Sequence, residues 1–379
     1  METDDPPTEY FSSYEDLEIH KLMLEDEPRT SAYKKAIMNN KRFFKDKVVM
    51  DVGCGTGILS IFCAQAGAKK VYAIEASKTA ELAMEIVKEN KFEDVIEVIH
   101  CKVEDLELPG NTKVDAIVSE WMGFYLLHEG MLDSVLLARD KFLKDGGEMF
   151  PESATIYVSP CSVPSLYRKW DNFHGVSMTT FAKQLRTCKY NKPEIMNVQA
   201  EDLMGCDEVA LGWINLKEDT VSNLDSYSIQ HVVGANKDGS YQGMCIWFEC
   251  VFPDLENDSE NYNPVRLDTG PLSPPTHWKQ TVIILPEEQE VETGDPIAFE
   301  LKMTRDAVTT RRYNLQLSLL DAEVIEHPLP CTCDLTKCLL IKTYMLQHPE
   351  LPSKTAMETN GIEDEAIDDD DIDDENDDG

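Results

Sequence analysis

The chain has 379 residues, with 71 Asp and Glu against 35 Lys and Arg, giving a formal net charge of −36 at pH 7. This length suits one large or two ordinary domains, and 42% hydrophobic residues supply enough apolar side chains for packed cores, which excludes pervasive disorder. The acidic balance argues against direct nucleic-acid binding, because neutralising phosphates requires clustered Lys and Arg, and it indicates either basic partners or simple solubility.

The N-terminal region predicts helices rather than a targeting or membrane segment. The first ten residues, METDDPPTEY, lack a basic stretch followed by an apolar one, and no apolar run approaches the ~18 residues of a membrane helix. We therefore expect no membrane association and no secretion. Residues 10–45 carry apolar side chains at helical spacing, and Pro28 suits the first turn of a second helix capped by Asp26 or Glu27.

Short apolar runs alternate with helical patterns from residue 47 to about 150. Ser77 is a candidate N-cap for the middle helix. Strand, helix and strand in succession predict a Rossmann-like α/β domain with a parallel sheet. The predicted strands are 47–51, 71–75, 95–99 and 114–118, and the predicted helices are 58–66, 77–90 and 131–143.

A glycine-rich loop follows the first of these strands and opens a helix. Its glycines, Gly53, Gly55 and Gly57, alternate with single residues, whereas a dinucleotide fingerprint has two residues between its second and third glycines. The pattern is similar to the first motif of S-adenosylmethionine-dependent methyltransferases. Glu75 ends the next strand, where a carboxylate can accept hydrogen bonds from ribose hydroxyls, and Val103 with Glu104 follows the third.

Two carboxylates flank a glycine-containing turn after the fourth strand. If the segment from Glu120 to Glu129 folds back, both side chains can face one cavity, where two acids repel each other unless a cation lies between them. An arginine guanidinium suits such a cavity because its planar set of donors matches carboxylates bidentately. The guanidinium is also protonated at pH 7 and is therefore a poor nucleophile. The two acids can make it more reactive by drawing positive charge away from the attacking nitrogen.

Beyond Pro151 the pattern changes to β-rich runs interrupted by Pro, Gly and Asn, which predicts an antiparallel β-barrel or sandwich. The longest runs are 154–158, 243–252, 280–285 and 314–320. We therefore divide the chain into residues 1–150, 151–345 and 346–379.

The cysteines and the C-terminal acids complete the survey. Eleven scattered cysteines indicate reduced thiols, and the dense group at Cys331, Cys333 and Cys338 lacks the paired CxxC spacing of a zinc ribbon, so we predict ordinary thiols and no metal. Between Gly361 and Gly379 stand twelve acids and no base; removing them from −36 leaves −24 on the remainder. This composition predicts a disordered tail that either solubilises the protein or attracts basic substrates.

Taken together, these motifs resemble those of protein arginine N-methyltransferases of type I, the asymmetric-dimethylating class. The likeness runs from about Tyr10 to residue 320, and it favours the predominantly nuclear, histone-modifying branch. The motifs that carry it are Tyr10-Phe-x-x-Tyr14, Ile19-His-x-x-Met-Leu-x-Asp26, Arg29-Thr30, Val52-Gly-Cys-Gly-Thr-Gly57, Ser119-Glu-Trp-Met-Gly123, Glu129-x-Met-Leu132 and Thr276-His-Trp-Lys-Gln280.

The resemblance implies a cofactor, S-adenosylmethionine, which leaves as S-adenosylhomocysteine. Arg29 would pair with its carboxylate, His20 and Gly53 would hold its amino-acid portion, Glu75 its ribose, and Glu104 its adenine. The implied cofactor-binding residues are His20, Arg29, Gly53, Gly55, Glu75, Val103 and Glu104.

The resemblance also implies the reacting groups. Glu120 and Glu129 would clamp the substrate guanidinium, and His277 would pair with Asp26, which together make the catalytic set. The substrate pocket would be lined by Tyr14, Met23, Met131 and Trp278, with the two methionines setting which nitrogen receives the second methyl group.

Further expectations concern assembly and location. The family carries a helical arm that docks on a second subunit; here it would lie near residues 163–196, shorter than usual, and form a homodimer. Phe124 replaces a tyrosine that many members have. The partners would be arginine-containing basic proteins, with histones as candidates, in the nucleus, the cytoplasm or both. Two alternatives stay open: a nucleotide-dependent oxidoreductase, and a non-catalytic acidic module that binds basic proteins.

Overall fold

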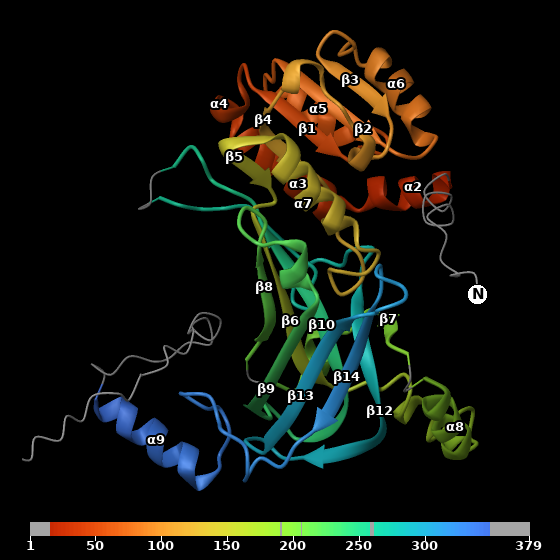
Figure 1. Cartoon of the computed structure of the whole chain (residues 1–379). Helices are drawn as coiled ribbons and strands as arrows, with labels where there is room; N and C mark the ends of the chain where they lie inside the picture. The colour runs from red at the N-terminus through yellow and green to blue at the C-terminus, as the bar shows by residue number, and fades with distance from the viewer. Residues whose placement is uncertain (1–15, 190–191, 206, 258–260, 349–379) are drawn as a thin grey trace, which may run out of the picture.

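The computed structural model describes residues 16–189, 192–205, 207–257 and 261–348. An α/β part is followed along the chain by an elongated β part (Figure 1). Tyr14 and the acidic tail lie outside the described residues. Within the described part of the chain, no helix is both long and apolar enough to cross a membrane.

The α/β part contains a five-stranded sheet in the order β3-β2-β1-β4-β5, in which every pair is parallel. Its strands are β1 (Val48–Val52), β2 (Lys70–Glu75), β3 (Ile96–His100), β4 (Val114–Val118) and β5 (Leu143–Phe150). The four predicted strands are confirmed, and β5 was not predicted. Strand order reverses between β1 and β4, and ligands of open α/β sheets bind at the carboxyl ends of strands beside such a point.

Helices cover this sheet, as the crossover connections of parallel strands require. They are α5 (Ile58–Gln65), α6 (Thr79–Glu89) and α7 (Met131–Phe142). The prediction that Ser77 caps α6 is wrong by one position, because Lys78 occupies the N-cap and no side chain caps the helix. The Ser77 hydroxyl accepts from the backbone of Thr79, while the Ser77 amide donates to Glu75, which bends the chain before the helix can start.

Three N-terminal helices pack beside the sheet: α2 (Leu17–Glu25), α3 (Glu27–Asn39) and α4 (Lys41–Phe44). Asp26 separates the first two, ending α2 and accepting a hydrogen bond from the Arg29 amide as the N-cap of α3, with Pro28 in the first turn. The structure thereby selects Asp26 rather than Glu27 as the cap. Asp26 and Arg29 are therefore held close together at the start of α3.

The β part is built from two antiparallel sheets, which confirms the predicted barrel region. The larger sheet has the order β7-β12-β10-β6-β8 with β11 paired to β10, and the smaller has the order β14-β13-β9. The strands are β6 (Ser153–Cys161), β7 (Glu194–Met196), β8 (Val209–Asn215), β9 (Ser226–Gly234), β10 (Gly239–Val251), β11 (Arg266–Asp268), β12 (Gln280–Val291), β13 (Pro296–Arg305) and β14 (Tyr313–Leu319).

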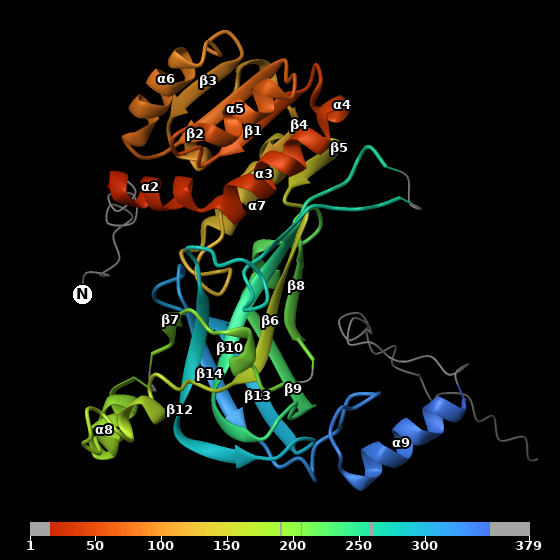
Figure 2. The same cartoon turned by 180° about the vertical axis from the view of Figure 1, so that it is seen from behind.

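Short helices decorate these sheets. Helix α8 (Thr179–Lys189) projects sideways from the β part, and α9 (Thr336–Gln347) lies at the end of the molecule remote from the parallel sheet (Figures 1 and 2). Short 3-10 turns occur at Val103–Asp105, Pro109–Asn111, Arg168–Trp170, Ala200–Asp202 and Val221–Leu224.

One hydrophobic core runs through both parts. At their junction, the ring of Tyr33 packs edge-on against Phe252 with centroids 4.8 Å apart, and Phe44 packs against Phe150 at 5.0 Å. Large buried aromatics contribute strongly to packing energy, so the two parts are joined rigidly at this point. A site formed between them can therefore keep a fixed geometry.

Candidate active site

A cavity of about 380 Å³ lies at the carboxyl end of the parallel sheet, bounded by α2, α3 and the segment that precedes β12. This volume is within the range of small-ligand sites. Thirteen of the fifteen residues predicted from the sequence line it: His20, Met23, Arg29, Gly53, Gly55, Glu75, Val103, Glu104, Glu120, Glu129, Met131, His277 and Trp278. Asp26 lies one hydrogen bond behind His277, and Tyr14 is outside the described residues.

The glycine loop forms one wall. Gly53 has φ +71°, which favours glycine, and a β-carbon there would lie 2.3 Å from the Met131 methyl group, so a larger residue would displace the end of the Met131 side chain. Glu75 fixes the far side by accepting from the Gly55 amide and from the Ser77 amide, each at 2.8 Å. Each carboxylate oxygen retains a second lone pair, so Glu75 can still accept from a ligand hydroxyl.

The turn between the two predicted acids does fold back. Gly123 and Leu126 exchange backbone hydrogen bonds, and a β-carbon on Gly123 would lie 2.0 Å from the His128 carbonyl oxygen. Glu129 follows with φ +76°, and its backbone amide donates a hydrogen bond of 2.8 Å to the Arg311 carbonyl. Both Glu120 and Glu129 consequently line the same cavity.

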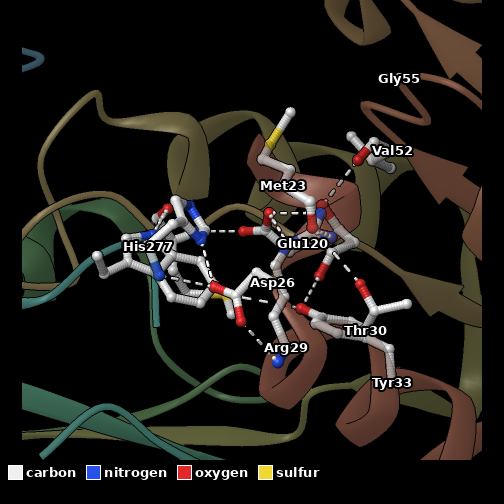
Figure 3. Close-up of polar contacts among 12 residues, drawn as sticks. Met23, Asp26, Arg29, Thr30, Tyr33, Val52, Gly55, Glu120 and His277 are labelled. Atoms are coloured by element: carbon white, nitrogen blue, oxygen red, sulfur yellow. Dashed lines mark hydrogen bonds and ion pairs between the residues drawn. The ribbon is translucent and has the colours of Figure 1, made fainter. Parts of the chain in front are cut away.

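Glu120 and Arg29 form a buried ion pair (Figure 3). The Arg29 Nε and Nη2 both donate to Glu120 Oε2 at 2.8 Å, and each side chain is only 7% exposed. Arg29 Nη1 also donates to the Met23 carbonyl at 3.1 Å. Arg29 therefore joins α2, α3 and the carboxylate turn in one network.

The predicted pair of His277 and Asp26 is present. Asp26 Oδ2 accepts from the His277 Nδ1 at 2.6 Å and from its backbone amide at 2.8 Å (Figure 3). Burial raises the pKa of Asp26, but the hydrogen bonds from His277 and Arg29 outweigh it and leave that pKa below its ordinary value. An ionised Asp26 fixes the proton of His277 on Nδ1 and leaves Nε2 able to accept one.

Trp278 and Glu104 occupy different sides of the cavity. The Trp278 indole is buried, donates from Nε1 to the Met122 carbonyl at 2.8 Å, and packs edge-on against Phe248. Glu104 is exposed at the opposite rim and accepts from the Ser134 hydroxyl at 2.6 Å. The tryptophan thus forms a rigid wall next to the acids, and Glu104 marks the open edge.

Two residues of the site were missed by the sequence analysis. Tyr33 donates its hydroxyl to the Ser119 carbonyl at 2.8 Å and so braces the strand end that carries Glu120; its position four residues after Arg29 on one helix was an available signal. Arg311 lines the cavity and donates from Nη1 to the Glu129 carbonyl at 2.7 Å. No local pattern marks it, because it reaches the site from the connection between β13 and β14.

Comparisons with known proteins agree with this geometry. A family model described as a methyltransferase domain matches residues 49–147, and one described as the arginine methyltransferase oligomerization subdomain matches residues 152–321. The chain is 38% identical over 331 residues to a probable protein arginine N-methyltransferase 6.1 of Oryza sativa subsp. japonica, covering 81% of this chain and 84% of that protein. It is 37% identical over 314 residues to protein arginine N-methyltransferase 1 of Saccharomyces cerevisiae, covering 82% and 87%.

Solved structures give the same result. The Trypanosoma brucei PRMT1 enzyme-prozyme heterotetrameric complex with AdoHcy matches with a TM-score of 0.71 and 35% identity, covering 83% of this chain and 97% of that one. The crystal structure of PRMT6-SAH matches with a TM-score of 0.68 and 30% identity, covering 80% and 100%. None of these similarities supports the oxidoreductase or the non-catalytic module considered above.

Proposed function

Because this chain belongs to the protein arginine N-methyltransferase family, we propose that it forms monomethyl- and asymmetric dimethylarginine in the cavity that Glu120 and Glu129 share. As a member of the family, it transfers methyl groups from S-adenosylmethionine to arginine residues of proteins. The observation that carries the finer proposal is the placement of two carboxylates and a glycine loop around one cavity.

The residues present fit the cofactor. The glycine loop, with its positive φ angles, leaves backbone surface open where a side chain would intrude, and Glu75 is already oriented for a diol. Arg29, His20 and Gly53 would hold the amino-acid end, Glu75 the ribose, and Val103 with Glu104 the adenine. When bound, S-adenosylmethionine supplies an electrophilic methyl group on a sulfonium centre.

The chain's own contribution is positioning and electrostatics. Glu120 and Glu129 bind the substrate guanidinium from two sides, hold it in one orientation, and draw its positive charge away from the attacking nitrogen. Glu120 also holds the buried Arg29, and Glu129 supplies the second acidic group that lines the cavity. Trp278 closes the side wall and restricts entry of water.

Asp26 and His277 provide a route for the proton that leaves the guanidinium. Asp26 accepts a hydrogen bond from the His277 Nδ1 at 2.6 Å, so Nε2 is the ring atom left to take up a proton. His277 lines the cavity, so a proton taken there can pass to solvent.

Product specificity is proposed from Met23 and Met131, which both line the cavity. Their flexible side chains occupy space beside the reacting nitrogen and direct the second methyl group to the nitrogen already methylated. Arginine-rich peptide incubated with labelled cofactor should yield asymmetric dimethylarginine on mass-spectrometric analysis, and the same peptide with lysine in place of arginine should stay unlabelled. Symmetric dimethylarginine as the sole dimethylated product would contradict the assignment to type I.

Homodimerisation is supported by the projecting segment that contains α8. Trp170 packs against Phe173 and Phe181, which are 38% and 47% exposed, and Val176 is 58% exposed. These residues form an apolar surface on an arm outside the barrel, as expected for a docking element. Sedimentation of the full chain should give a dimer, and Phe181→Asp should give a monomer.

We further propose basic, arginine-bearing substrates such as histone tails, and residence in the nucleus, the cytoplasm or both. The net charge of −36 supports the first proposal through electrostatic steering. Methylation of cell extract by the purified chain, followed by identification of the labelled proteins, tests the substrates, and imaging of a tagged chain tests the location.

A further inference from the structure

A compact cluster of sulfur and nitrogen atoms is formed by the loop after β14 and the first turn of α9, in a segment beyond the family match that ends at residue 321. Its members are His327, Cys331, Cys333 and Cys338, and the three cysteines are 4%, 0% and 3% exposed. The segment lies at the end of the barrel far from the parallel sheet (Figures 1 and 2), so the cluster is separate from the methyl-transfer cavity.

The four side chains converge on one point. The ligand atoms lie within 4.8 Å of one another. The His327 Nδ1 is 3.3 Å from the Cys331 sulfur, 3.4 Å from that of Cys333 and 3.1 Å from that of Cys338, and the first two sulfurs are 3.4 Å apart. A tetrahedral ion with metal–sulfur bonds of ~2.3 Å and metal–nitrogen bonds of ~2.0 Å separates its ligands by about 3.5–3.8 Å, so small shifts of the four side chains suffice.

Hydrogen bonding among these groups accounts for only part of the convergence: the Cys331 thiol can donate to the Cys333 sulfur, but one ring nitrogen of His327 has all three sulfurs as neighbours. The His327 Nε2 lies 2.7 Å from the Ala322 carbonyl oxygen, which can only accept, so Nε2 carries the proton. Nδ1 of the neutral ring then has a single lone pair, yet three sulfurs surround it. A cation in the centre satisfies the nitrogen and all three sulfurs, and a backbone carbonyl behind a ligating histidine is the usual arrangement at metal sites.

We propose that His327, Cys331, Cys333 and Cys338 bind one structural Zn²⁺ ion in a closed tetrahedral Cys₃His site. Thiolates with one imidazole are a typical zinc ligand set, and four protein ligands leave no open position for catalysis. The spacing is His-x₃-Cys-x-Cys-x₄-Cys. Because it contains no CxxC pair and its fourth ligand is a histidine, the cysteines taken alone predicted ordinary thiols.

The ion would anchor α9 and the preceding loop to the barrel. Two hydrogen bonds of 2.8 Å hold the loop: the Gly234 amide donates to the Thr332 hydroxyl, and the Asp334 amide donates to the Gly294 carbonyl. Within Thr336–Gln347, however, Cys338 is the one buried residue. A twelve-residue helix with so little buried surface is marginal by itself, so the metal bond through Cys338 supplies the attachment that packing does not.

Metal content of the full chain provides the first test. The protein purified under reducing conditions should contain about one zinc per chain by elemental mass spectrometry, as a closed four-ligand site requires. After chelation, titration with Co²⁺ alone should produce the thiolate-to-cobalt charge-transfer and tetrahedral d–d absorption bands. The exposed Cys188 offers a matched control, since Cys188→Ser should leave both readouts unchanged.

Two variants at one position separate ligand loss from general misfolding. His327→Ala should lose the zinc, whereas His327→Cys should keep it as a four-thiolate site with a changed cobalt spectrum. Hydrogen exchange should speed up in 336–347 on zinc removal and stay unchanged in β10. The proposal is overturned if the wild-type chain with reduced thiols binds neither ion, if its cysteines pair in a disulfide instead, or if His327→Ala retains the metal with an unaltered spectrum.

Discussion

The two acids of the active site should respond differently to loss of charge, although both face one cavity. Glu120 forms a pair with Arg29 in which both side chains are 7% exposed, whereas Glu129 is half-buried. Replacing each acid with the isosteric glutamine removes a charge and keeps the shape. Glu120→Gln is therefore expected to reduce folding stability by more than Glu129→Gln does, and both changes should reduce turnover.

The size of the difference follows from the buried ion pair. Removing one partner of a buried pair leaves the other charge without compensation and costs about 3–5 kcal/mol. A glutamine carbonyl oxygen in the place of Glu120 Oε2 can still accept from Arg29, although without the charge, which places Glu120→Gln near the lower value, about 3 kcal/mol. For the half-buried Glu129, solvent screens the change, and we expect about 1 kcal/mol or less.

Urea unfolding and initial methylation rates measure the two effects. Both variants should lose about 10²–10³ in the rate on an arginine-rich peptide, the usual cost of removing one preorganised electrostatic contact. Glu107→Gln is the matched control, because Glu107 is exposed and lies outside the cavity. Equal unfolding free energies for the two active-site variants would refute the reasoning about Arg29, and undiminished turnover of Glu129→Gln would refute the clamp.

Three further changes test the buried Asp51 of β1, which accepts from the Ser60 hydroxyl, and two residues that line the cavity, Gly53 and Trp278. Burial raises the pKa of Asp51 from 3.8 to about 7, so between pH 5 and 7 the folded state keeps a proton that the unfolded state releases, and folding stability falls as pH rises. Over this range, urea unfolding should show the wild type losing about 2–3 kcal/mol of unfolding free energy relative to Asp51→Asn. Parallel profiles of stability against pH for the two proteins would contradict this. Gly53→Ala places a β-carbon against Met131 and should weaken S-adenosylhomocysteine binding about tenfold. Gly146→Ala is the control, because Gly146 has a similar φ of +70° but no atom within 4 Å of the added β-carbon, and it should leave the affinity unchanged. Equal affinities of the two variants by calorimetry would exclude the contact with Met131 as the cause. Trp278→Phe loses the buried hydrogen bond of 2.8 Å to the Met122 carbonyl, worth about 1–2 kcal/mol, and should raise the KM for peptide while the cofactor affinity stays unchanged. An unchanged KM would contradict the proposal that Trp278 contacts the substrate.

The sequence predicted those parts of the fold in which local pattern and burial agree. Strands β1, β2 and β4 are buried and therefore read as continuous apolar runs. By contrast β5, with the sequence LKDGGEMF, lies at the sheet edge with four of its first five residues polar or glycine, and it resembles a loop until β4 pairs with it. The edge position explains why the strand was missed.

The site was predictable as a set of residues but not as a network. Gly53, Glu75 and Glu120 stand at strand ends, so parallel topology alone brings them to one edge. The bond between Arg29 and Glu120 joins residues 91 apart, and that between Asp26 and His277 joins residues 251 apart. No local pattern encodes such contacts, because they depend on how the N-terminal helices dock on the sheet and the barrel.

This network gives the two halves of the reaction a physical connection. Arg29, the residue assigned to the cofactor carboxylate, bonds at the same time to Glu120, the residue assigned to the substrate guanidinium. We expect a carboxylate that binds Arg29 to compete for its donors and to free lone pairs on Glu120, which could then accept from a substrate guanidinium. Occupancy of one subsite should thereby strengthen binding at the other, and thermodynamic linkage would make the effect reciprocal. On this reasoning, calorimetry should show tighter binding of an arginine peptide in the presence of S-adenosylhomocysteine than in its absence.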